Sequence, residues 1–323
     1  MDIKESIWIE KYRPSKFSEI HGQEKIVERI EAMVKLRNIP HLLFTGPPGV
    51  GKSTLALTIA KELFGDSWHQ NFLELNTSDD RGIDTIRGII KDFARIKPIG
   101  DFPFKIIFLD ECDNMTKDAQ HALRRTMETF AQATRFLLSC NYSSKIIDPI
   151  LSRCTVFRFK PLEEKEIKKI IENIALKENL KINEEAIKAL YKISEGDCRK
   201  LENVLQSCAA IDNNINEELV FSLVSAARPK EIKEIMEIAL KGDFLKSREK
   251  LLDTMLKYGL SGIDTIKQIQ KEIWSLEIEE QKKVFLIDKC GEIEFRIVEG
   301  SDEFVQIESF LANLVLANRP EKI

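Results

Sequence analysis

The sequence predicts an α/β domain with a parallel sheet, followed by two helical domains. Three observations support this prediction. Short apolar runs alternate with helical patterns over residues 1–161, the strand signal is absent after Lys160-Pro161-Leu162, and a glycine-rich segment follows the first apolar run. Strands that alternate with helices are typical of a parallel sheet covered by helices on both faces. We therefore expect the parallel sheet to lie in the first half of the chain.

The predicted strands share one sequence pattern: each is short, almost continuously apolar and bounded by turn residues. Such runs are expected where both faces of a strand are buried, as in a parallel sheet. The five runs are 41–45, 72–76, 105–109, 135–139 and 155–159.

Beyond residue 161 the apolar spacing becomes helical. Ile167, Ile170, Ile171 and Ile174 lie on one helix face. Arg228-Pro229 indicates a second boundary, because the residue before proline avoids helical dihedral angles. The predicted division is an α/β domain at 1–161, a small helical domain at 162–228 and a larger helical domain at 229–323. The small domain is expected to contain helices near 184–194, 199–210 and 217–224, and the larger one five helices.

Composition excludes several classes of protein. The chain is 43% hydrophobic and 32% charged, which suits a soluble globular fold, and it contains no run of 18 apolar residues. Its formal net charge of −4 does not predict nucleic-acid binding, so any DNA contact must come from local patches. The charged start Met1-Asp2-Ile3-Lys4-Glu5 is unlike a signal peptide. We expect a cytoplasmic protein without a membrane partner.

Cysteine and histidine spacing gives no metal or nucleophile motif. The six cysteines include no C-x-x-C pair, and the four histidines lack the spacing of metal ligands. Free thiols in a reducing compartment are the simplest interpretation, and a structural zinc site or a Cys-His nucleophile has little support.

The first chemical motif is a phosphate-binding loop, which matches G-x-x-x-x-G-K-[S/T] over Gly46-Pro47-Pro48-Gly49-Val50-Gly51-Lys52-Ser53-Thr54. It follows a predicted strand and opens a predicted helix, the context in which this motif binds phosphate. Backbone N–H groups and the positive helix end would face the phosphates. Lys52 is expected to reach the β- and γ-phosphates, and Ser53 to bind Mg²⁺. A glycine-rich turn without a ligand is the alternative.

The second motif is a buried strand that ends in two carboxylates, Asp110 and Glu111. Ligands bind at the carboxyl ends of strands in a parallel sheet. Asp110 fits a second partner of Mg²⁺, and Glu111 fits the base that activates water for attack on the γ-phosphate. Standing alone, the pair would be better explained as a solvated acidic turn, but the phosphate loop upstream favours function.

Three further polar residues extend this set. Asn141 ends another apolar strand, beside the one that carries Glu111, and could hold the attacking water or the γ-phosphate. Arg153, in Ser152-Arg153-Cys154, precedes the last strand and could stabilise phosphoryl charge at its own site or a neighbour's. Arg199 lies in the first turn of a helix that Asp197 would cap, an unfavourable place for a cation, which points to an anionic partner. Ordinary turn and surface roles are the alternatives for each.

Basic patches are candidates for contact with DNA phosphates. They are Arg81, Thr85 and Arg87 with Lys91 a turn later, the pair Arg124-Arg125, and Lys145. A solvated charged face explains each patch at least as well.

Taken together, these motifs resemble the replication factor C small subunit, the clamp-loader branch of the AAA+ ATPases. The resemblance is dense from residue 6 to 229 and includes Trp8-Ile9-Glu10-Lys11-Tyr12-Arg13-Pro14, Asp110-Glu111-Cys112-Asp113 and Gly196-Asp197-Cys198-Arg199. It implies an AAA+ P-loop core with a five-stranded parallel sheet, a helical lid and a helical collar. Residues 76–82 depart slightly from the family's usual pattern but retain Arg81.

The resemblance also implies ATP and Mg²⁺ as ligands and assigns roles to residues. Lys52 and Ser53 would hold nucleotide and metal, Asp110 the metal, and Glu111 would be the catalytic base. Asn141 would be the sensor residue of the core domain. Arg199 would be the sensor residue of the lid and would contact the γ-phosphate within the same chain. Arg153 would be a finger that reaches the neighbouring subunit's site, and the segment Tyr12-Arg13-Pro14 would lie near the adenine.

The activity implied by the resemblance is ATP-driven loading of the sliding clamp (PCNA) onto primer–template DNA, without sequence specificity. The implied partners are other small subunits and a large subunit. The short leader before Trp8 favours an archaeal protein, which would be nucleoid-associated; a eukaryotic one would be nuclear. Two alternatives stay open: another AAA+ motor on DNA, such as a branch-migration helicase or initiator, and a scaffold that binds ATP without hydrolysing it.

Overall fold

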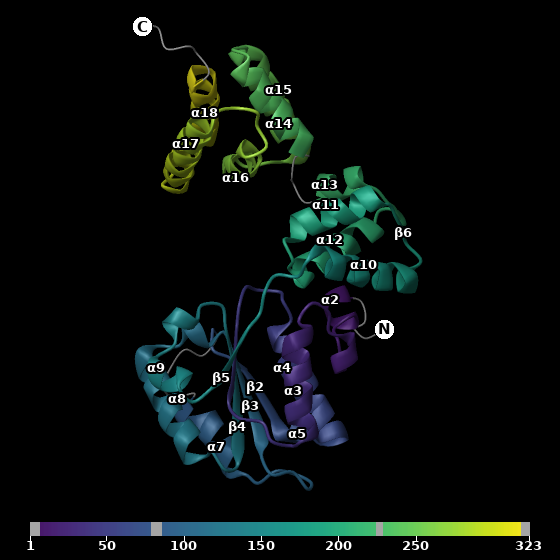
Figure 1. Ribbon diagram of the computed structural model, residues 1–323, viewed down its shortest axis with the longest axis vertical. Coiled ribbons are helices and arrows are strands. Elements are labelled where there is room, and N and C mark those ends of the chain that lie inside the picture. The colour runs from purple at the N-terminus through teal and green to yellow at the C-terminus, as the bar shows by residue number, and fades with distance from the viewer. Residues whose placement is uncertain (1–6, 79–85, 224–228, 318–323) are drawn as a thin grey trace. The chain divides into compact units, whose positions relative to one another are not determined.

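The computed structural model describes residues 7–78, 86–223 and 229–317. The chain divides into two compact units: Met1–Leu180 with Leu190–Gln206, and Lys181–Ala189 with Ser207–Ile323. The first unit is built on a parallel sheet and the second consists mostly of helices (Figure 1). The three-domain division predicted from the sequence stays a prediction.

The first unit contains a five-stranded sheet with the order β2-β3-β4-β1-β5. Every neighbouring pair is parallel; β1, for example, aligns Leu42 with Leu137 of β4 and with Thr155 of β5. The strands are β1 (Leu42–Thr45), β2 (Phe72–Asn76), β3 (Lys105–Asp110), β4 (Thr134–Cys140) and β5 (Thr155–Arg158). All five predicted strands are confirmed, each to within one residue at either end.

Helices cover both faces of this sheet. Leu42 and Phe44 of β1 pack into a core with α3 (Glu24–Lys35) and α4 (Lys52–Phe64). Leu43, on the opposite face, belongs to a second core with α8 (Lys117–Thr129) and α9 (Asp148–Leu151). Figure 1 shows the two helix layers on either side of the strands. Because successive strand residues face opposite cores, both must be apolar, which explains the continuous apolar runs in the sequence.

Shorter elements and the remaining helices of this unit connect the layers. The short elements are α2 (Trp8–Lys11), η1 (Phe17–Glu19), η2 (Gly65–Ser67), α5 (Trp68–Asn71), η3 (Ile86–Ile90), α7 (Lys91–Arg95), η4 (Cys112–Asn114) and η5 (Ser143–Lys145). The longer helices are α10 (Glu164–Glu178) and α12 (Cys198–Ala209), and α11 (Glu184–Ser194) precedes α12 along the chain.

The second unit contains a feature that the sequence did not predict. Residues β6 (Lys181–Ile182) and β7 (Asn214–Ile215) pair as a two-stranded parallel sheet, although no strand was expected after residue 161. Each strand has two residues, too few for a period-2 pattern. The pairing depends on contact between distant segments, which local periodicity does not report.

The five helices predicted beyond Arg228-Pro229 are confirmed as α14 (Pro229–Leu240), α15 (Phe244–Tyr258), α16 (Gly262–Ile273), α17 (Glu280–Val298) and α18 (Glu303–Ala317). Local signals mark their ends: Gly259 caps α15 with a left-handed backbone, and Ser261 forms a capping box with Asp264 at the start of α16. Within the described residues, no helix is long and apolar enough to span a membrane.

A histidine joins the strands at the start of the sheet. The Nδ1 atom of His41 accepts a hydrogen bond from Phe136 N at 3.0 Å, and His41 O accepts one from Thr155 N at 2.8 Å. Burial, with a smaller effect of the Arg135 charge, lowers the pKa of His41 from 6.5 to about 4. The imidazole is therefore neutral in the fold, as its acceptor role requires.

We predict that His41 makes the fold sensitive to acid. Between pH 6.5 and about 4 the unfolded chain takes up a proton that the folded chain does not, so stability falls as pH falls through this window. Replacing it by asparagine (His41→Asn) keeps an acceptor oxygen without a titrating group. As the pH falls from 6.5 to about 4, the Tm of the parent should therefore decrease more than the Tm of His41→Asn. The exposed His121, replaced in the same way, is the control; an identical pH response in all three proteins would contradict the prediction.

Candidate active site

The phosphate loop has the backbone shape that its glycines allow. Gly49 and Gly51 adopt φ values of 67° and 94°, in the left-handed region, and Gly51 is the N-cap of α4. A Cβ atom on Gly49 would come within 1.7 Å of the Asp197 carboxylate. The helix that follows has 13 residues, and its free N–H groups lie at the loop. This end of α4 is therefore suited to bind an anion.

Lys52 lies at the start of α4 and is only 7% exposed. Its Nζ atom donates to the carbonyl oxygens of Gly46 at 2.6 Å and Pro47 at 2.7 Å and to Asn141 Oδ1 at 3.1 Å. Burial lowers the pKa of Lys52, and the nearby Asp110 carboxylate opposes this effect. A buried ammonium held mainly by uncharged oxygens would be better neutralised by a phosphate.

Ser53 and Asp110 place two oxygens side by side. Ser53 Oγ donates to Asp110 Oδ2 at 2.5 Å, and Glu111 N donates to Asp110 Oδ1 at 2.9 Å. The two residues come from α4 and β3, which the sheet brings together at its carboxyl edge. A hydroxyl and a carboxylate next to a phosphate loop are the oxygen donors that Mg²⁺ prefers, so the residues present fit this ion.

Glu111 is held in a strained backbone conformation with φ 53°. Its Oε2 atom accepts hydrogen bonds from Ser78 Oγ and from Asn114 Nδ2, the latter at 3.2 Å. Thr77 Oγ1 also donates to the carbonyl oxygen of Glu111 at 2.8 Å. A non-glycine residue in the left-handed region costs free energy and is common at functional sites. No sequence motif indicates these partners. The signal that could have found Thr77 and Ser78 is their position directly after β2, which pairs with β3.

These groups line one cavity of about 490 Å³. Of the predicted nucleotide-binding residues, the cavity walls include Tyr12, Arg13, Pro14 and the loop from Pro48 to Thr54. Asp110, Glu111, Asn141 and Arg199 also line it. Gly46 and Pro47 do not, and they contribute instead the carbonyl oxygens that hold Lys52. Arg153 does not line this cavity either.

The start of α12 contacts the phosphate loop directly. Cys198 N donates to Gly49 O at 2.9 Å, and Asp197 Oδ1 accepts from Lys200 N at 3.1 Å, so Asp197 caps the helix as its position suggested. This contact places Arg199, in the first turn, at the cavity wall. Arg199, a cation at the unfavourable end of its helix, thus lines the same cavity as Lys52.

The opening segment packs against two helices of the same unit. Trp8 N donates to Gln206 Oε1 of α12 at 3.1 Å, and the Tyr12 hydroxyl donates to Glu178 of α10. Lys11 forms an ion pair with Glu178 at 2.5 Å. The segment is thereby fixed along the cavity, where Ile170 and Ile174 of α10 add apolar surface. Such a mixed wall suits a planar base beside a phosphate site.

The cavity also contains a buried carboxyl group that the sequence analysis missed. Glu202 of α12 is 8% exposed and lines the cavity. Burial, together with the charges of Asp197 and Glu10, raises the pKa of Glu202 to about 8, against the lowering effect of Arg199. At neutral pH this side chain is therefore mostly protonated.

The predicted DNA contacts are only partly described. Arg81 and Thr85 lie outside the described residues, and of Arg87 only the backbone is described, in η3. Lys145 ends η5 as an exposed residue, with Nζ 5.2 Å from the centroid of the Tyr142 ring. The DNA-binding roles of these residues stay predictions.

Comparison with known proteins gives two family matches and several close relatives. Residues 42–162 match the ATPase family associated with various cellular activities (AAA), and residues 227–313 match the Replication factor C C-terminal domain. A protein described as "Replication factor C small subunit" from Methanococcus maripaludis is 52% identical over 307 residues, which covers 95% of this chain and 98% of that protein. The protein of the same description from Archaeoglobus fulgidus is 50% identical over 308 residues, which covers 95% of this chain and 97% of that protein. That from Thermofilum pendens is 49% identical and covers 98% of both chains.

The chain belongs to the replication factor C small-subunit family. This membership confirms the resemblance indicated by the motifs, and the relatives named above are archaeal. It makes the chain an ATPase of the clamp-loader type and does not favour the alternative of another AAA+ motor.

Solved structures with a similar fold agree with the architecture. The Thermotoga maritima RuvB Holliday junction branch migration motor superposes with a TM-score of 0.57, at 21% identity over 70% of this chain and 78% of that one. A variant of Thermotoga maritima RuvB with one substitution also has a TM-score of 0.57 and covers 80% of this chain and 91% of its own, at 20% identity. At this identity the similarity concerns the fold alone, and the family assignment rests on the sequence relatives.

We predict that Glu202 destabilises the replication factor C fold as pH rises. Between its ordinary pKa of 4.5 and about 8 the folded chain retains a proton that the unfolded chain loses, so stability falls across this window. Glu202→Gln removes this titration, and its Tm relative to the parent should rise between about pH 5 and pH 9, by about 2–4 °C for each kcal/mol.

The matched control is Glu62→Gln, at an exposed glutamate of α4. A Tm difference between Glu202→Gln and the parent that stays constant across the same pH range would show that the carboxyl group is ionised in the fold.

Proposed function

We propose that this chain is a catalytically active clamp-loader subunit that uses Mg²⁺–ATP, is stimulated by DNA and the sliding clamp (PCNA), and works with other small subunits and a large subunit. The observation that supports catalysis best is the shared cavity: Lys52, Ser53, Asp110, Glu111 and Arg199 line one space. A scaffold that only binds ATP would have no need for a base held beside the phosphate loop. The division into core (1–161), lid (162–228) and collar (229–323) is part of this proposal.

ATP would enter with its phosphates at the N-terminus of α4 and its base beside the opening segment. Lys52 would exchange the carbonyl oxygens of Gly46 and Pro47 for phosphate oxygens, which are charged and form stronger hydrogen bonds. Ser53 and Asp110, already 2.5 Å apart, would hold Mg²⁺. When bound, this ion neutralises phosphate charge during transfer.

Glu111 would accept a proton from the attacking water. Hydrogen bonds from Ser78 and Asn114 hold its carboxylate group in place beside the phosphate loop, as a base requires. Asn141 would hold the γ-phosphate together with Lys52, to which it is already hydrogen-bonded at 3.1 Å. Arg199 would contact the γ-phosphate from α12, so that hydrolysis changes the contacts between loop and lid.

Arg153 would act on the site of a neighbouring subunit. Its guanidinium does not line the cavity of its own chain, whereas an arginine that stabilises phosphoryl transfer must reach the γ-phosphate. The DNA would be contacted through its phosphates, without sequence reading, by Arg81, Thr85, Arg87 and Lys145. We place the protein in the cytoplasm, at the nucleoid of an archaeal cell.

The proposal is tested by replacing the base. Glu111→Gln in the assembled complex should retain ATP binding but lower kcat by about 10²–10⁴-fold, because a general base contributes this much. Binding is measured by equilibrium titration with labelled ATP, and turnover by steady-state hydrolysis with and without clamp and primed DNA. Glu62→Gln is the control. Parent-like turnover in Glu111→Gln, or a parent complex that clamp and DNA fail to stimulate, would contradict the proposal.

The neighbouring-subunit role is tested separately. Arg153→Ala should leave the ATP affinity of the isolated subunit unchanged, because the side chain lies outside its own cavity. In the assembled complex it should lower kcat by at least about 10³-fold, the size of effect known for such arginines. Full stimulated hydrolysis by an assembled Arg153→Ala complex would rule out this role.

A further inference from the structure

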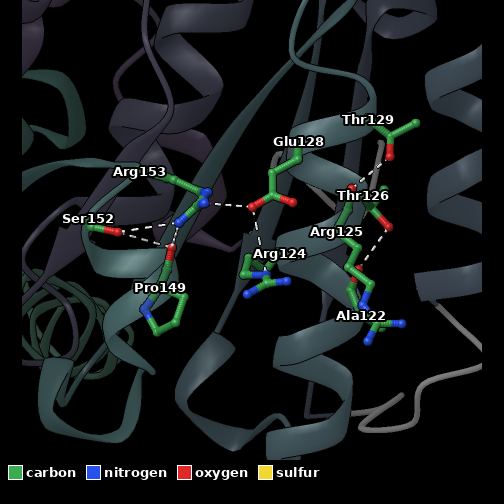
Figure 2. A network of polar contacts seen from close by, with 9 residues as sticks. All are labelled: Ala122, Arg124, Arg125, Thr126, Glu128, Thr129, Pro149, Ser152 and Arg153. Atoms are coloured by element: carbon green, nitrogen blue, oxygen red, sulfur yellow. Dashed lines mark hydrogen bonds and ion pairs between the residues drawn. The ribbon is translucent and has the colours of Figure 1, made fainter.

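Arg153 is held in one orientation by its own chain (Figure 2). It follows helix α9, and its NH1 group donates to the carbonyl oxygen of Pro149 at 2.7 Å. Its NH2 group lies 2.6 Å from Oε1 of Glu128, in the last turn of α8. The two contacts engage separate nitrogens of the planar guanidinium, so together they restrain both its position and its plane.

The same carboxylate oxygen faces a second arginine. Arg124 lies one turn before Glu128 on α8, and its Nε atom is 3.7 Å from Glu128 Oε1 (Figure 2). Among the described residues this Nε atom is buried without a hydrogen-bond partner. One carboxylate therefore faces two guanidinium groups, so these three side chains together carry one net positive charge.

We propose that Glu128 is a positioning residue for Arg153: it preorganises the guanidinium for the phosphate of a neighbouring subunit's nucleotide. This inference rests on the proposed role of Arg153. A free arginine side chain has many rotamers, and selecting one on docking costs entropy. Glu128 and Pro149 make that selection before the subunits meet.

The ion pair between Arg153 and Glu128 is weak enough for the guanidinium to bind a phosphate as well. The side chains of Arg153 and Glu128 are 38% and 41% exposed, and ion pairs with this exposure contribute little to stability. A nucleotide phosphate carries more charge than a carboxylate, so it can attract the guanidinium without competition from a buried bond. Glu128 also lies close to Arg124, so its charge stays compensated when the guanidinium of Arg153 binds the phosphate.

A purely structural explanation is the alternative. Glu128 and Arg124 are four residues apart on α8, and such pairs are common on exposed helix faces. This explanation predicts that removal of Glu128 affects stability but not turnover, and that its effect does not depend on Arg153.

A double-mutant cycle separates the two explanations. The parent, Glu128→Ala, Arg153→Ala and the double variant are assembled into the complete complex, and ATP hydrolysis is measured with clamp and primed DNA. We expect Glu128→Ala to lower kcat by about threefold to fivefold, the effect of one exposed charge pair, with KM unchanged. In the Arg153→Ala background the same change should have no further effect on kcat.

Two further variants keep the test decisive. Glu128→Gln is isosteric and keeps an acceptor oxygen, so it should fold and assemble as the parent does and lose less turnover than Glu128→Ala. Glu62→Ala, at an exposed glutamate of α4, should leave kcat unchanged. ATP binding by the isolated subunit should be the same in all variants.

Distinct outcomes identify which idea fails. Parent-like or increased kcat in both Glu128 variants, with a large loss in Arg153→Ala, would overturn the role of Glu128 and leave that of Arg153 intact. An equal loss on removing Glu128 with and without Arg153 would also overturn it. If Arg153→Ala itself retains full turnover, the neighbouring-subunit role fails first, and the inference about Glu128 fails with it.

Discussion

The active site depends on the close approach of the phosphate loop to the start of α12. Gly49 O accepts the hydrogen bond from Cys198 N, and the space where a Cβ of Gly49 would lie is occupied by the Asp197 carboxylate. Only glycine meets both requirements, a left-handed backbone and the absence of a side chain. The phosphate loop and the helix that carries Arg199 are therefore positioned by one contact.

The parallel sheet supplies the other side of the site. In the order β2-β3-β4-β1-β5, the carboxyl ends of β1, β3 and β4 lie at one edge, and the phosphate loop, Asp110-Glu111 and Asn141 follow these strands. The strands are buried on both faces, so their ends have little freedom to move. Polar groups that would be expensive inside the core are instead gathered at its edge, where they pair with one another or with a ligand.

Local patterns predicted much of this arrangement because the relevant signals are local. Apolar runs revealed the strands, and the glycines with Lys52 and Ser53 revealed the loop. Asn141 could be placed beside Glu111 once the strands were recognised as neighbours. The contact of Glu128 with Arg153 could not be predicted, since the two residues lie on separate elements that no sequence pattern brings together. The contact of Ser78 with Glu111 could have been inferred only from the pairing of β2 with β3, because no motif marks it. The raised pKa of Glu202 and the pairing of β6 with β7 likewise arise only from the folded environment.

Lys52 in the cavity and Arg153 outside it share one feature. Each has an internal partner that is not a buried charge: neutral carbonyl oxygens for Lys52, and a half-exposed carboxylate for Arg153. These partners keep the two cations in place without a buried ion pair, which would be costly to separate. Little of the free energy of phosphate binding is therefore spent on breaking the internal contacts. Glu202 is mostly protonated at neutral pH, because burial raises its pKa to about 8, so it adds little negative charge to the cavity. The proposed nucleotide site is thus one whose positive charges are only loosely balanced by the protein itself.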